Sequence, residues 1–215
     1  MKIINSKFEI LTEISNGGIK ELQHIEKIGR VCYKSEDRIT EDGKSAKKFV
    51  KMLINRGHEA MIEHSSLSVK FIVDRGVSHE LVRHRIASFA QESTRYCNYS
   101  NDKFGNEITV VEPCFWDDKS TNYIIWETAM KTAEETYFRL LELGATPQEA
   151  RSVLPNSLKT EITITANYRE WRNFFKLRTE QAAHPQMREV TIPLLKELQK
   201  RIPIIFDDIE VSYSE

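Results

Sequence analysis

Strict alternation of apolar and polar side chains in two stretches constrains the fold most. In residues 66–73 apolar side chains stand at every second position, with Ile72 as the one apolar residue out of phase. The same period recurs in residues 161–166, where Glu and Thr alternate with Ile, Ile and Ala. Successive side chains of a strand point to opposite faces, so each stretch predicts a strand with one buried face.

Apolar spacing, Gly and Pro predict the remaining elements. Helices are expected at 19–33, 45–55, 121–143, 169–180 and 187–200, the last kinked or restarted at Pro193. Short strands are expected at 2–13, 108–111 and 204–211, turns at 98–106, and a short helix after an N-cap at Thr146. A helical spacing that begins at Val77 is expected to lead into residues 83–96. With no repeat or linker, the chain is predicted to be α+β: one compact domain, 1–215, with a mainly antiparallel sheet flanked by helices.

Composition excludes several classes of protein. Hydrophobic residues make up 40% and charged residues 29%, which is ordinary for a soluble globular protein. The net charge of −1 argues against a bulk nucleic-acid binder, which normally has a basic surplus. No apolar run is long enough for a membrane span or a signal peptide. Three cysteines without a Cys-x-x-Cys pair favour a reducing cytoplasm.

The residues 83–96 concentrate the chemistry of the chain. They contain three arginines, a histidine, a glutamine, a glutamate and several hydroxyls, without glycine or proline. A guanidinium is permanently charged and presents a planar fork of donors, which suits phosphates and flat polar rings. The alternative is that this segment is only a solvated helix face.

Other site chemistries are disfavoured. The chain has neither a Gly-x-Gly-x-x-Gly segment nor a phosphate loop. His58 to His64 superficially suggests a zinc protease, but the second histidine of that motif would stand at position 62, which is Ile. Two imidazoles six residues apart on a helix point about 120° away from each other. We therefore expect no metal site.

The helix expected at 169–180 has two distinct faces. One is an aromatic stripe that ends in Arg178, and the other is polar: Trp171, Phe174 and Phe175 form the stripe, and Arg169, Asn173 and Lys176 share the second face. Arg178 could simply lay its stem on the stripe and send its head to water.

Four segments, in order, resemble those of the flavin-dependent thymidylate synthases. They are His-Glu-x-x-x-Glu-His (58–64), Arg-His-Arg followed after seven residues by Ser (83–93), Ala-Arg-x-x-Leu-Pro (150–155) and Asn-x-Arg-x-x-x-Asn-x-x-x-x-Arg (167–178). The resemblance covers roughly residues 55 to 210. It implies a homotetramer with active sites shared between subunits, in which FAD is the cofactor.

The resemblance also assigns residues. The implied FAD contacts are Ala60, Arg83, His84, Arg85, Gln91, Asn167, Arg169 and Asn173. The implied contacts to deoxyuridine monophosphate (dUMP) are Glu80, Arg83, Gln91, Glu92, Ser93, Thr94, Arg95, Arg151 and Arg178. Arg178 is the implied catalytic residue, which would lie at the uracil edge and polarise the ring. Arg172, on the same helix, has no role in the family.

The implied reaction is reductive methylation of dUMP to dTMP, with methylenetetrahydrofolate as carbon donor and NADPH as reductant. A dianionic phosphate suits paired arginines with hydroxyl donors, and a cation at the uracil edge stabilises charge as it develops. Ser93 is expected to bind the nucleotide without acting as a nucleophile, since no His-carboxylate pair is dedicated to it. Ala182, Gln91 and Glu80 depart from residues found in some members of the family.

Two alternatives come from other classes. A non-catalytic phosphate- or RNA-binding module would explain the Arg-aromatic interleaving at residues 95–96 and 169–172. A thymidylate synthase with a cysteine nucleophile is disfavoured, because no cysteine has a histidine partner in a recognisable motif.

Overall fold

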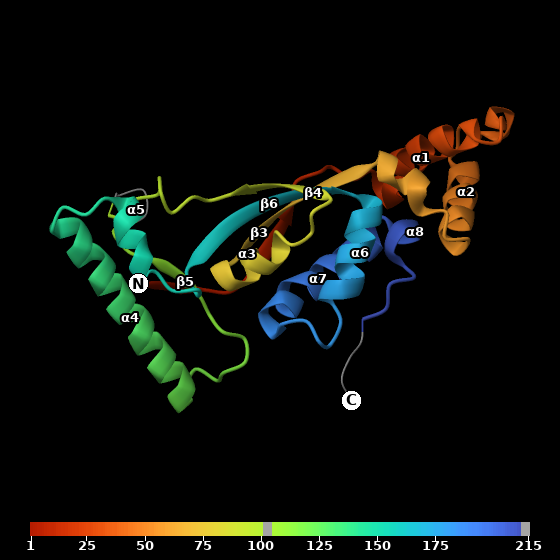
Figure 1. The fold of residues 1–215 in the computed structure, drawn as a ribbon. Helices are drawn as coiled ribbons and strands as arrows, with labels where there is room; N and C mark the ends of the chain where they lie inside the picture. The colour runs from red at the N-terminus through yellow and green to blue at the C-terminus, as the bar shows by residue number, and fades with distance from the viewer. Residues whose placement is uncertain (101–104, 212–215) are drawn as a thin grey trace. The chain divides into compact units, whose positions relative to one another are not determined.

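The computed structural model describes residues 1–100 and 105–211. The chain forms two compact units, each made of three segments. The first unit comprises Met1–Lys7, Phe71–Arg83 and Phe89–Thr163, and the second comprises Phe8–Lys70, His84–Ser88 and Ile164–Glu215. The structure is α+β, as predicted, whereas the extent of a single 1–215 domain stays a prediction (Figure 1).

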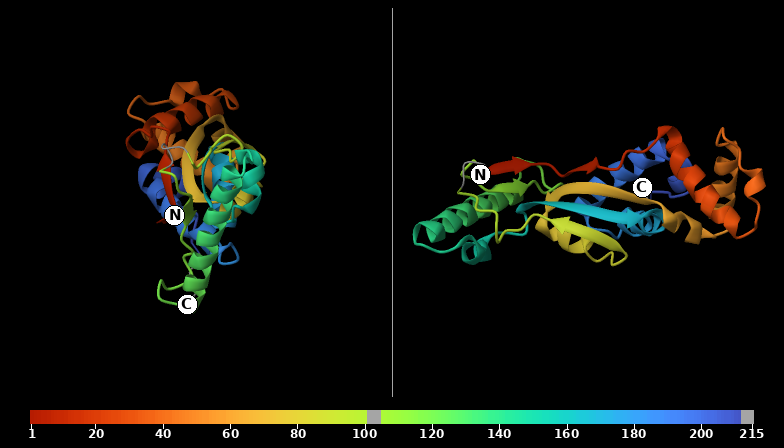
Figure 2. Two further views of the ribbon diagram at one scale, coloured as in Figure 1. Left: turned by 90° about the vertical axis from the view of Figure 1, so that its left-hand side faces the viewer. Right: turned by 90° about the horizontal axis from the view of Figure 1, so that it is seen from above.

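A four-stranded sheet has the order β2 (Lys7–Ile10), β3 (Ser66–Asp74), β6 (Lys159–Asn167), β4 (Ala87–Gln91). Figure 2 shows the long strands β3 and β6 side by side. The Ser68 and Thr165 hydroxyls are 2.7 Å apart in the second unit, and Arg75 N donates to Leu158 O at 3.1 Å in the first. Residue numbers thus rise along one strand as they fall along the other, so β3 and β6 are antiparallel.

Both predicted alternations are confirmed. The apolar positions of the two long strands are buried, with exposed fractions of 0% at Leu67, Val69, Phe71, Val73 and Ile162, 3% at Ile164 and 7% at Ala166. The single strand predicted at 2–13 is two strands in the structure, because its two halves belong to different sheets. β1 (Lys2–Ile4) is parallel to β5 (Thr109–Val111), whereas β2 joins the four-stranded sheet.

Helices make up most of the rest of the second unit. They are α1 (Ile19–Val31), α2 (Lys44–Asn55), the 3-10 helix η3 (Glu59–His64), α6 (Tyr168–Arg178), α7 (Pro185–Arg201) and α8 (Pro203–Phe206). Pro193 lies inside α7, which continues without a restart. The predicted strand 204–211 is wrong. Pro203, whose fixed φ suits a first helical position, begins α8, and Ile205 and Phe206 are fully buried there.

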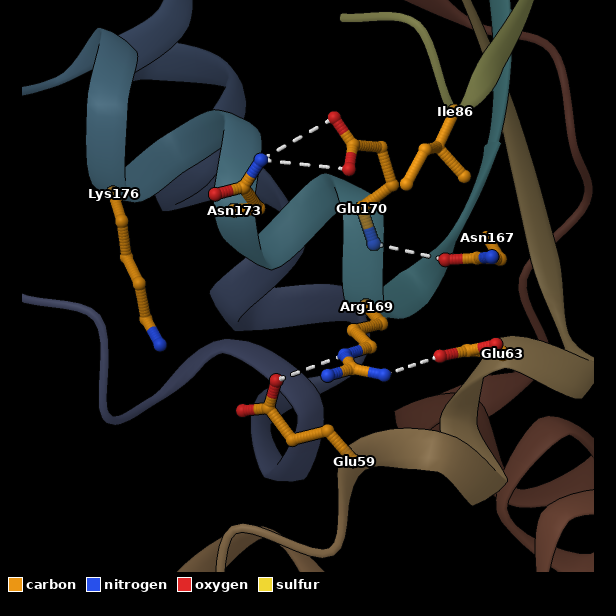
Figure 3. A pocket seen from close by; sticks show the side chains of 8 residues that line it. All are labelled: Glu59, Glu63, Ile86, Asn167, Arg169, Glu170, Asn173 and Lys176. Atoms are coloured by element: carbon orange, nitrogen blue, oxygen red, sulfur yellow. Dashed lines mark hydrogen bonds and ion pairs between the residues drawn. The ribbon is translucent and has the colours of Figure 1, made fainter.

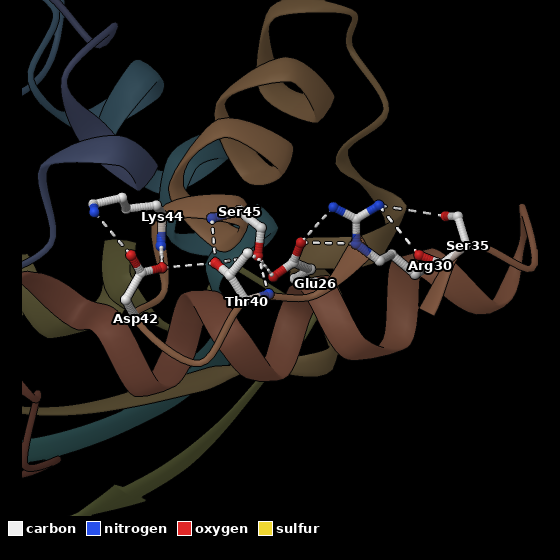
Figure 4. Close-up of polar contacts among 7 residues, drawn as sticks. All are labelled: Glu26, Arg30, Ser35, Thr40, Asp42, Lys44 and Ser45. Carbon is white, nitrogen blue, oxygen red and sulfur yellow. Dashed lines mark hydrogen bonds and ion pairs between the residues drawn. The ribbon is translucent and has the colours of Figure 1, made fainter. Parts of the chain in front are cut away.

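A buried charge joins α1 to α2 (Figure 4). The Glu26 side chain is fully buried, and Arg30 Nε donates to its Oε1 at 2.7 Å. Ser45 Oγ, from α2, donates to the other carboxylate oxygen at 2.8 Å. A buried carboxylate requires such partners, so this network specifies how the two helices pack.

The first unit contains α3 (Arg75–Leu81), α4 (Thr121–Glu142), α5 (Pro147–Ala150) and a 3-10 turn at Arg151–Val153. The predicted N-cap at Thr146 is confirmed as a capping box with Glu149. Residues 98–100 and 105–106 are in or next to turns, as expected, and the rest of that prediction lies outside the described residues.

The helix expected to begin near Val77 and to lead into residues 83–96 is present as α3, but it does not continue into those residues. α3 is capped by Asp74, whose carboxylate accepts from Val77 N at 2.7 Å, and it ends at Leu81. Residues 87–91 then form β4, because they pair with β6 at the edge of the sheet. His84 is buried between the exposed Arg83 and Arg85, so this segment is not a solvated helix face.

Candidate active site

A pocket of ≈ 500 Å³ lies in the second unit between η3, the segment before β4, and α6 (Figure 3). Its lining is mostly polar: Glu59, Glu63, Ile86, Asn167, Arg169, Glu170, Asn173 and Lys176. The predicted polar face of α6 is confirmed, since all three of its members line this pocket.

The junction between β6 and α6 fixes this polar face. Asn167 ends the strand with extended backbone, and its side-chain oxygen accepts from Glu170 N at 2.8 Å, which caps the helix. On the other face the aromatic stripe is buried, and Trp171 Nε1 donates to Leu67 O at 2.9 Å. The helix is thus anchored by its apolar face and turns Arg169 and Asn173 toward the pocket.

Arg169 is paired with two carboxylates of η3. Its Nη1 lies 2.5 Å from Glu63 Oε1, and its Nε lies 4.0 Å from Glu59 Oε2. The hydrogen bond and charge of Glu63 raise the pKa of Arg169. Sequence reasoning missed both glutamates as site residues. Their signal was the 58–64 segment itself, which places two carboxylates four residues apart.

His84 connects Glu170 to Arg178. Its Nδ1 lies 3.0 Å from Glu170 Oε1, and Arg178 Nε donates to its Nε2 at 3.0 Å. The ring packs edge-on against Phe174, with centroids 4.9 Å apart. Burial and, to a smaller extent, the charge of Arg178 lower the pKa of His84, although Glu170 opposes the shift. Arg178 therefore does not merely send its head to water.

Arg172 has a structural role that the sequence did not reveal. Its side chain is only 2% exposed, and it grips both carboxylate oxygens of Asp208 at 2.6 and 2.7 Å. It also donates to Glu59 Oε1 at 3.0 Å and to the Ile205 carbonyl. The hydrogen bond from Arg172 lowers the pKa of Asp208. The expectation of a residue without a role is wrong, because Arg172 ties α6 to η3 and to the segment after α8.

A second charged cluster lies in the first unit, in the turn that follows β4. Thr94 is buried, and its hydroxyl accepts from Arg151 Nη1 at 3.3 Å. The Ser93 hydroxyl accepts from Arg95 N at 3.3 Å, and the Arg95 guanidinium lies 5.5 Å from the centre of the Tyr96 ring. Both guanidiniums are on exposed residues. We call Ser93, Thr94, Arg95 and Arg151 the arginine–hydroxyl cluster.

The two residues before this cluster form bonds within the first unit. Gln91 Nε2 donates to Ser78 Oγ at 2.9 Å and to Thr160 Oγ1 at 3.3 Å. Glu92 pairs with Lys159 at 2.9 Å. These bonds fix the end of β4 and hold the following turn in place.

The implied site residues divide between the units. The first unit holds Glu80, Arg83, Gln91, Glu92, Ser93, Thr94, Arg95 and Arg151, and the second holds Ala60, His84, Arg85, Asn167, Arg169, Asn173 and Arg178. Three of the second group line the pocket, and His84 contacts the lining residue Glu170. Ala60 lies on η3 with the two lining glutamates, and Arg85 precedes the lining residue Ile86.

Two kinds of feature are absent from the described residues. Among residues 1–100 and 105–211, no three His, Cys, Asp or Glu side chains are grouped so that they could hold a metal ion. Within the same residues, no helix has the length and apolar character needed to cross a membrane.

Comparisons with known proteins show the family of the chain. The family model described as "Thymidylate synthase complementing protein" matches residues 19–204. The flavin-dependent thymidylate synthase of Corynebacterium aurimucosum is 31% identical over 216 residues, which is 93% of this chain and 84% of that protein. That of Mycobacterium tuberculosis is 32% identical over 204 residues, 87% of this chain and 79% of that protein.

A solved structure shares the fold. The UMP/dUMP methylase PolB from Streptomyces cacaoi, bound with 5-Br dUMP, superposes with a TM-score of 0.76 over 96% of each chain at 22% identity. The family model covers most of the chain, and both relatives exceed 30% identity over most of their length. The chain belongs to the flavin-dependent thymidylate synthase family.

Proposed function

We propose that the protein catalyses the reductive methylation of dUMP to dTMP, with FAD as cofactor, methylenetetrahydrofolate as carbon donor and NADPH as reductant. Family membership supports the reaction class. The observation that carries the assignment of the nucleotide site is the arginine–hydroxyl cluster. In it the Arg151 guanidinium donates to the Thr94 hydroxyl and the Arg95 backbone amide donates to the Ser93 hydroxyl, and both arginines are exposed residues. The three cysteines of the protein are free thiols, which is in keeping with action in the cytoplasm.

In this proposal the arginine–hydroxyl cluster binds the phosphate of dUMP. Within the described part of the chain, the Arg95 guanidinium contacts the Tyr96 ring and the Arg151 guanidinium contacts the Thr94 hydroxyl, both of which are neutral groups. Their charges are therefore available to a dianion, which two guanidiniums and neighbouring hydroxyls bind through charge-assisted hydrogen bonds. Ser93 serves here as a hydrogen-bonding ligand, and its described contact is a backbone amide, with no base to activate it.

Arg178 is proposed as the catalytic residue at the uracil edge. C5 of uracil must become electron-rich before it accepts a one-carbon unit. A guanidinium at the carbonyl and N3 edge stabilises the negative charge that develops. The aromatic stripe beneath Arg178 excludes water, which strengthens that interaction. Glu80 and Arg83 are proposed to flank the same base, with Gln91, Glu92 and Thr94 as further contacts.

The second-unit pocket fits FAD by the chemistry of its lining. Arg169 and Lys176 supply positive charge for a diphosphate, and Asn173 supplies an amide for a polar ring. The carboxylate of Glu59 can accept hydrogen bonds from hydroxyl groups. When bound, the flavin would supply the hydride chemistry that no side chain provides. Ala60, Arg83, His84, Arg85, Gln91 and Asn167 complete the proposed contacts.

The homotetramer with shared active sites is part of the same proposal. Its support is the family and the division of the implied site residues between two units of the chain. Mixing two inactive variants, Arg83→Ala and Asn173→Ala, should restore part of the activity if one site draws these residues from different subunits. No recovery in verified mixed oligomers would assign each site to one chain.

The function is tested by incubating the purified protein with FAD, dUMP, methylenetetrahydrofolate and NADPH and quantifying dTMP. We expect a yellow protein and dTMP formation that requires all four compounds. The rival hypothesis is a phosphate- or RNA-binding module without catalysis. A colourless protein that binds RNA and forms no dTMP would support that module and contradict the enzyme.

A further inference from the structure

We propose that His84 is a positioning residue, which is held neutral with its proton on Nδ1 and orients Arg178 through a hydrogen bond to Nε2. This inference rests on the proposed function of Arg178. It assigns to the His84 side chain a role in the chemical step, in addition to any contact with the cofactor.

The donor and acceptor inventory fixes the tautomer. A guanidinium has only donors, so the 3.0 Å contact from Arg178 Nε requires His84 Nε2 to accept. The ring proton must then be on Nδ1, where it donates to Glu170 Oε1 at 3.0 Å. Both nitrogens of the ring are thereby satisfied, and Glu170 is held in turn by Asn173 Nδ2 at 3.4 Å. The imidazole is buried, so this is a fixed arrangement and not a mobile surface contact.

The surroundings of the ring favour the neutral form. The described charged groups that face it are Glu170 and Arg178, both from α6, and Phe174 of the same helix covers it. Its own neighbours in sequence, Arg83 and Arg85, are exposed. Burial and Arg178 keep the pKa of His84 below its usual value of 6.5. The histidine is therefore neutral at pH 7 and accepts from Arg178.

Protonation would break this contact. A charged imidazole has donors on both nitrogens and cannot accept from a guanidinium. As pH falls through the lowered pKa of His84, Arg178 loses this hydrogen bond and turnover should fall. Glu170 raises the pKa of His84, so Glu170→Gln should move this acid limb of the rate profile to lower pH. A purely structural role of His84 would not predict that shift.

The first test is a measurement on the unaltered protein. Nitrogen-15 NMR of histidine-labelled protein at pH 7.5 distinguishes the two neutral tautomers, and the His84 signals are those missing from His84→Phe. We expect the Nδ1–H tautomer. An Nε2–H tautomer or a charged ring would overturn the proposal, independently of any activity.

The second test is kinetic and uses dUMP-dependent oxidation of reduced flavin in single turnover. His84→Phe places another aromatic ring beside Phe174 but removes both ring nitrogens. Its rate at saturating dUMP should fall about tenfold to a hundredfold, as expected for a misplaced catalytic group, with little change in dUMP affinity. The matched control is His24→Gln, an exposed histidine on α1, which should behave like the parent.

The outcomes separate this inference from the proposed function. Slow turnover of Arg178→Ala together with parent-like turnover of His84→Phe would overturn the role of His84 alone. Parent-like turnover of both variants would overturn the role of Arg178 as well. If His84→Phe does not fold, the pH profile of Glu170→Gln decides, and an unchanged acid limb would overturn the proposal.

Discussion

The arginines of the two charged regions are held in opposite ways. In the second unit, Arg169 and Arg172 contact carboxylates at 2.5–3.0 Å, and Arg178 contacts an imidazole at 3.0 Å. In the first unit, Arg95 and Arg151 are exposed and contact an aromatic ring and a hydroxyl. In the pocket region the protein itself pairs these arginines, whereas we propose that the charge of the arginine–hydroxyl cluster meets a ligand.

The clearest contrast is between Arg172, which the protein pairs in its interior, and Arg95 and Arg151, which we propose bind a ligand. A buried charge without a partner is costly, so the buried Arg172 must be paired within the chain. An exposed guanidinium is solvated and can exchange water for a phosphate at little cost. Burial therefore marks Arg172 as a structural residue, whereas Arg169 and Arg178 are paired but not buried and are proposed to meet ligands as well.

The largest expected effect is on stability. Arg172→Ala removes the partner of Asp208 and Glu59 from a buried position, and the free energy of unfolding should fall by about 3 kcal/mol. Denaturant unfolding would measure it. Arg139→Ala is the control, since its pair with Glu142 is exposed on both sides and should contribute less than about 1 kcal/mol. Equal effects of the two variants would remove the distinction between buried and exposed arginines.

Arg178 should affect turnover more than binding. Arg178→Ala removes a charge-assisted bond from a partly buried site, worth about 1.5–3 kcal/mol, or roughly tenfold to a hundredfold in rate. Arg178→Lys should recover little, because an ammonium cannot reproduce the planar fork. The assay is single-turnover oxidation of reduced flavin at saturating dUMP, with Arg201→Ala on α7 as the control. A parent-like rate for Arg178→Ala would show that its charge is not used in the reaction.

Ser93 should contribute one neutral hydrogen bond to the nucleotide. Ser93→Ala should weaken dUMP binding by about 0.5–1.5 kcal/mol and keep measurable turnover. Ser66→Ala, at an exposed position on β3, serves as the control in equilibrium binding. Complete loss of turnover with dUMP and FAD still bound would instead make Ser93 a participant in the chemistry.

The smallest expected effect concerns the pairing of Glu63 with Arg169 in the second-unit pocket. Glu63 pairs with Arg169, whose side chain is 54% exposed, and such a pair contributes about 0–1 kcal/mol. If Glu63 competes with the diphosphate for Arg169, Glu63→Gln should tighten FAD binding by up to about fivefold, measured by flavin fluorescence. Glu142→Gln is the control. Weaker FAD binding by Glu63→Gln would mean that this carboxylate helps to hold the cofactor.

The sequence predicted elements whose signal is local. The alternation in residues 66–73, the helix at 121–143 and the N-cap at Thr146 each depend on neighbours in the chain, and each is confirmed. The strand predicted at 204–211 failed, because Pro203 begins a helix there. The helix expected from Val77 is present but stops before residues 83–96, where β4 pairs with β6 instead.

The sequence also suggested most candidate site residues but not their partners. Motif resemblance pointed to Arg169, Arg178 and His84. It could not show that Arg169 meets Glu63, more than a hundred positions earlier, or that Arg178 meets His84. The structural role of Arg172 was not predicted for the same reason, since its partners Glu59 and Asp208 lie 113 and 36 positions away in the sequence.

The most direct test of the account measures dUMP and FAD binding to two variants, one from each region. Arg151→Ala should weaken dUMP binding by about 1.5–3 kcal/mol and leave FAD binding nearly unchanged, because it removes the guanidinium of an exposed arginine from the arginine–hydroxyl cluster. Arg169→Ala should weaken FAD binding and leave dUMP binding nearly unchanged. Both affinities can be determined by titration calorimetry on the folded variants. Loss of dUMP binding in Arg169→Ala with normal dUMP binding in Arg151→Ala would contradict the division between a nucleotide cluster and a flavin pocket.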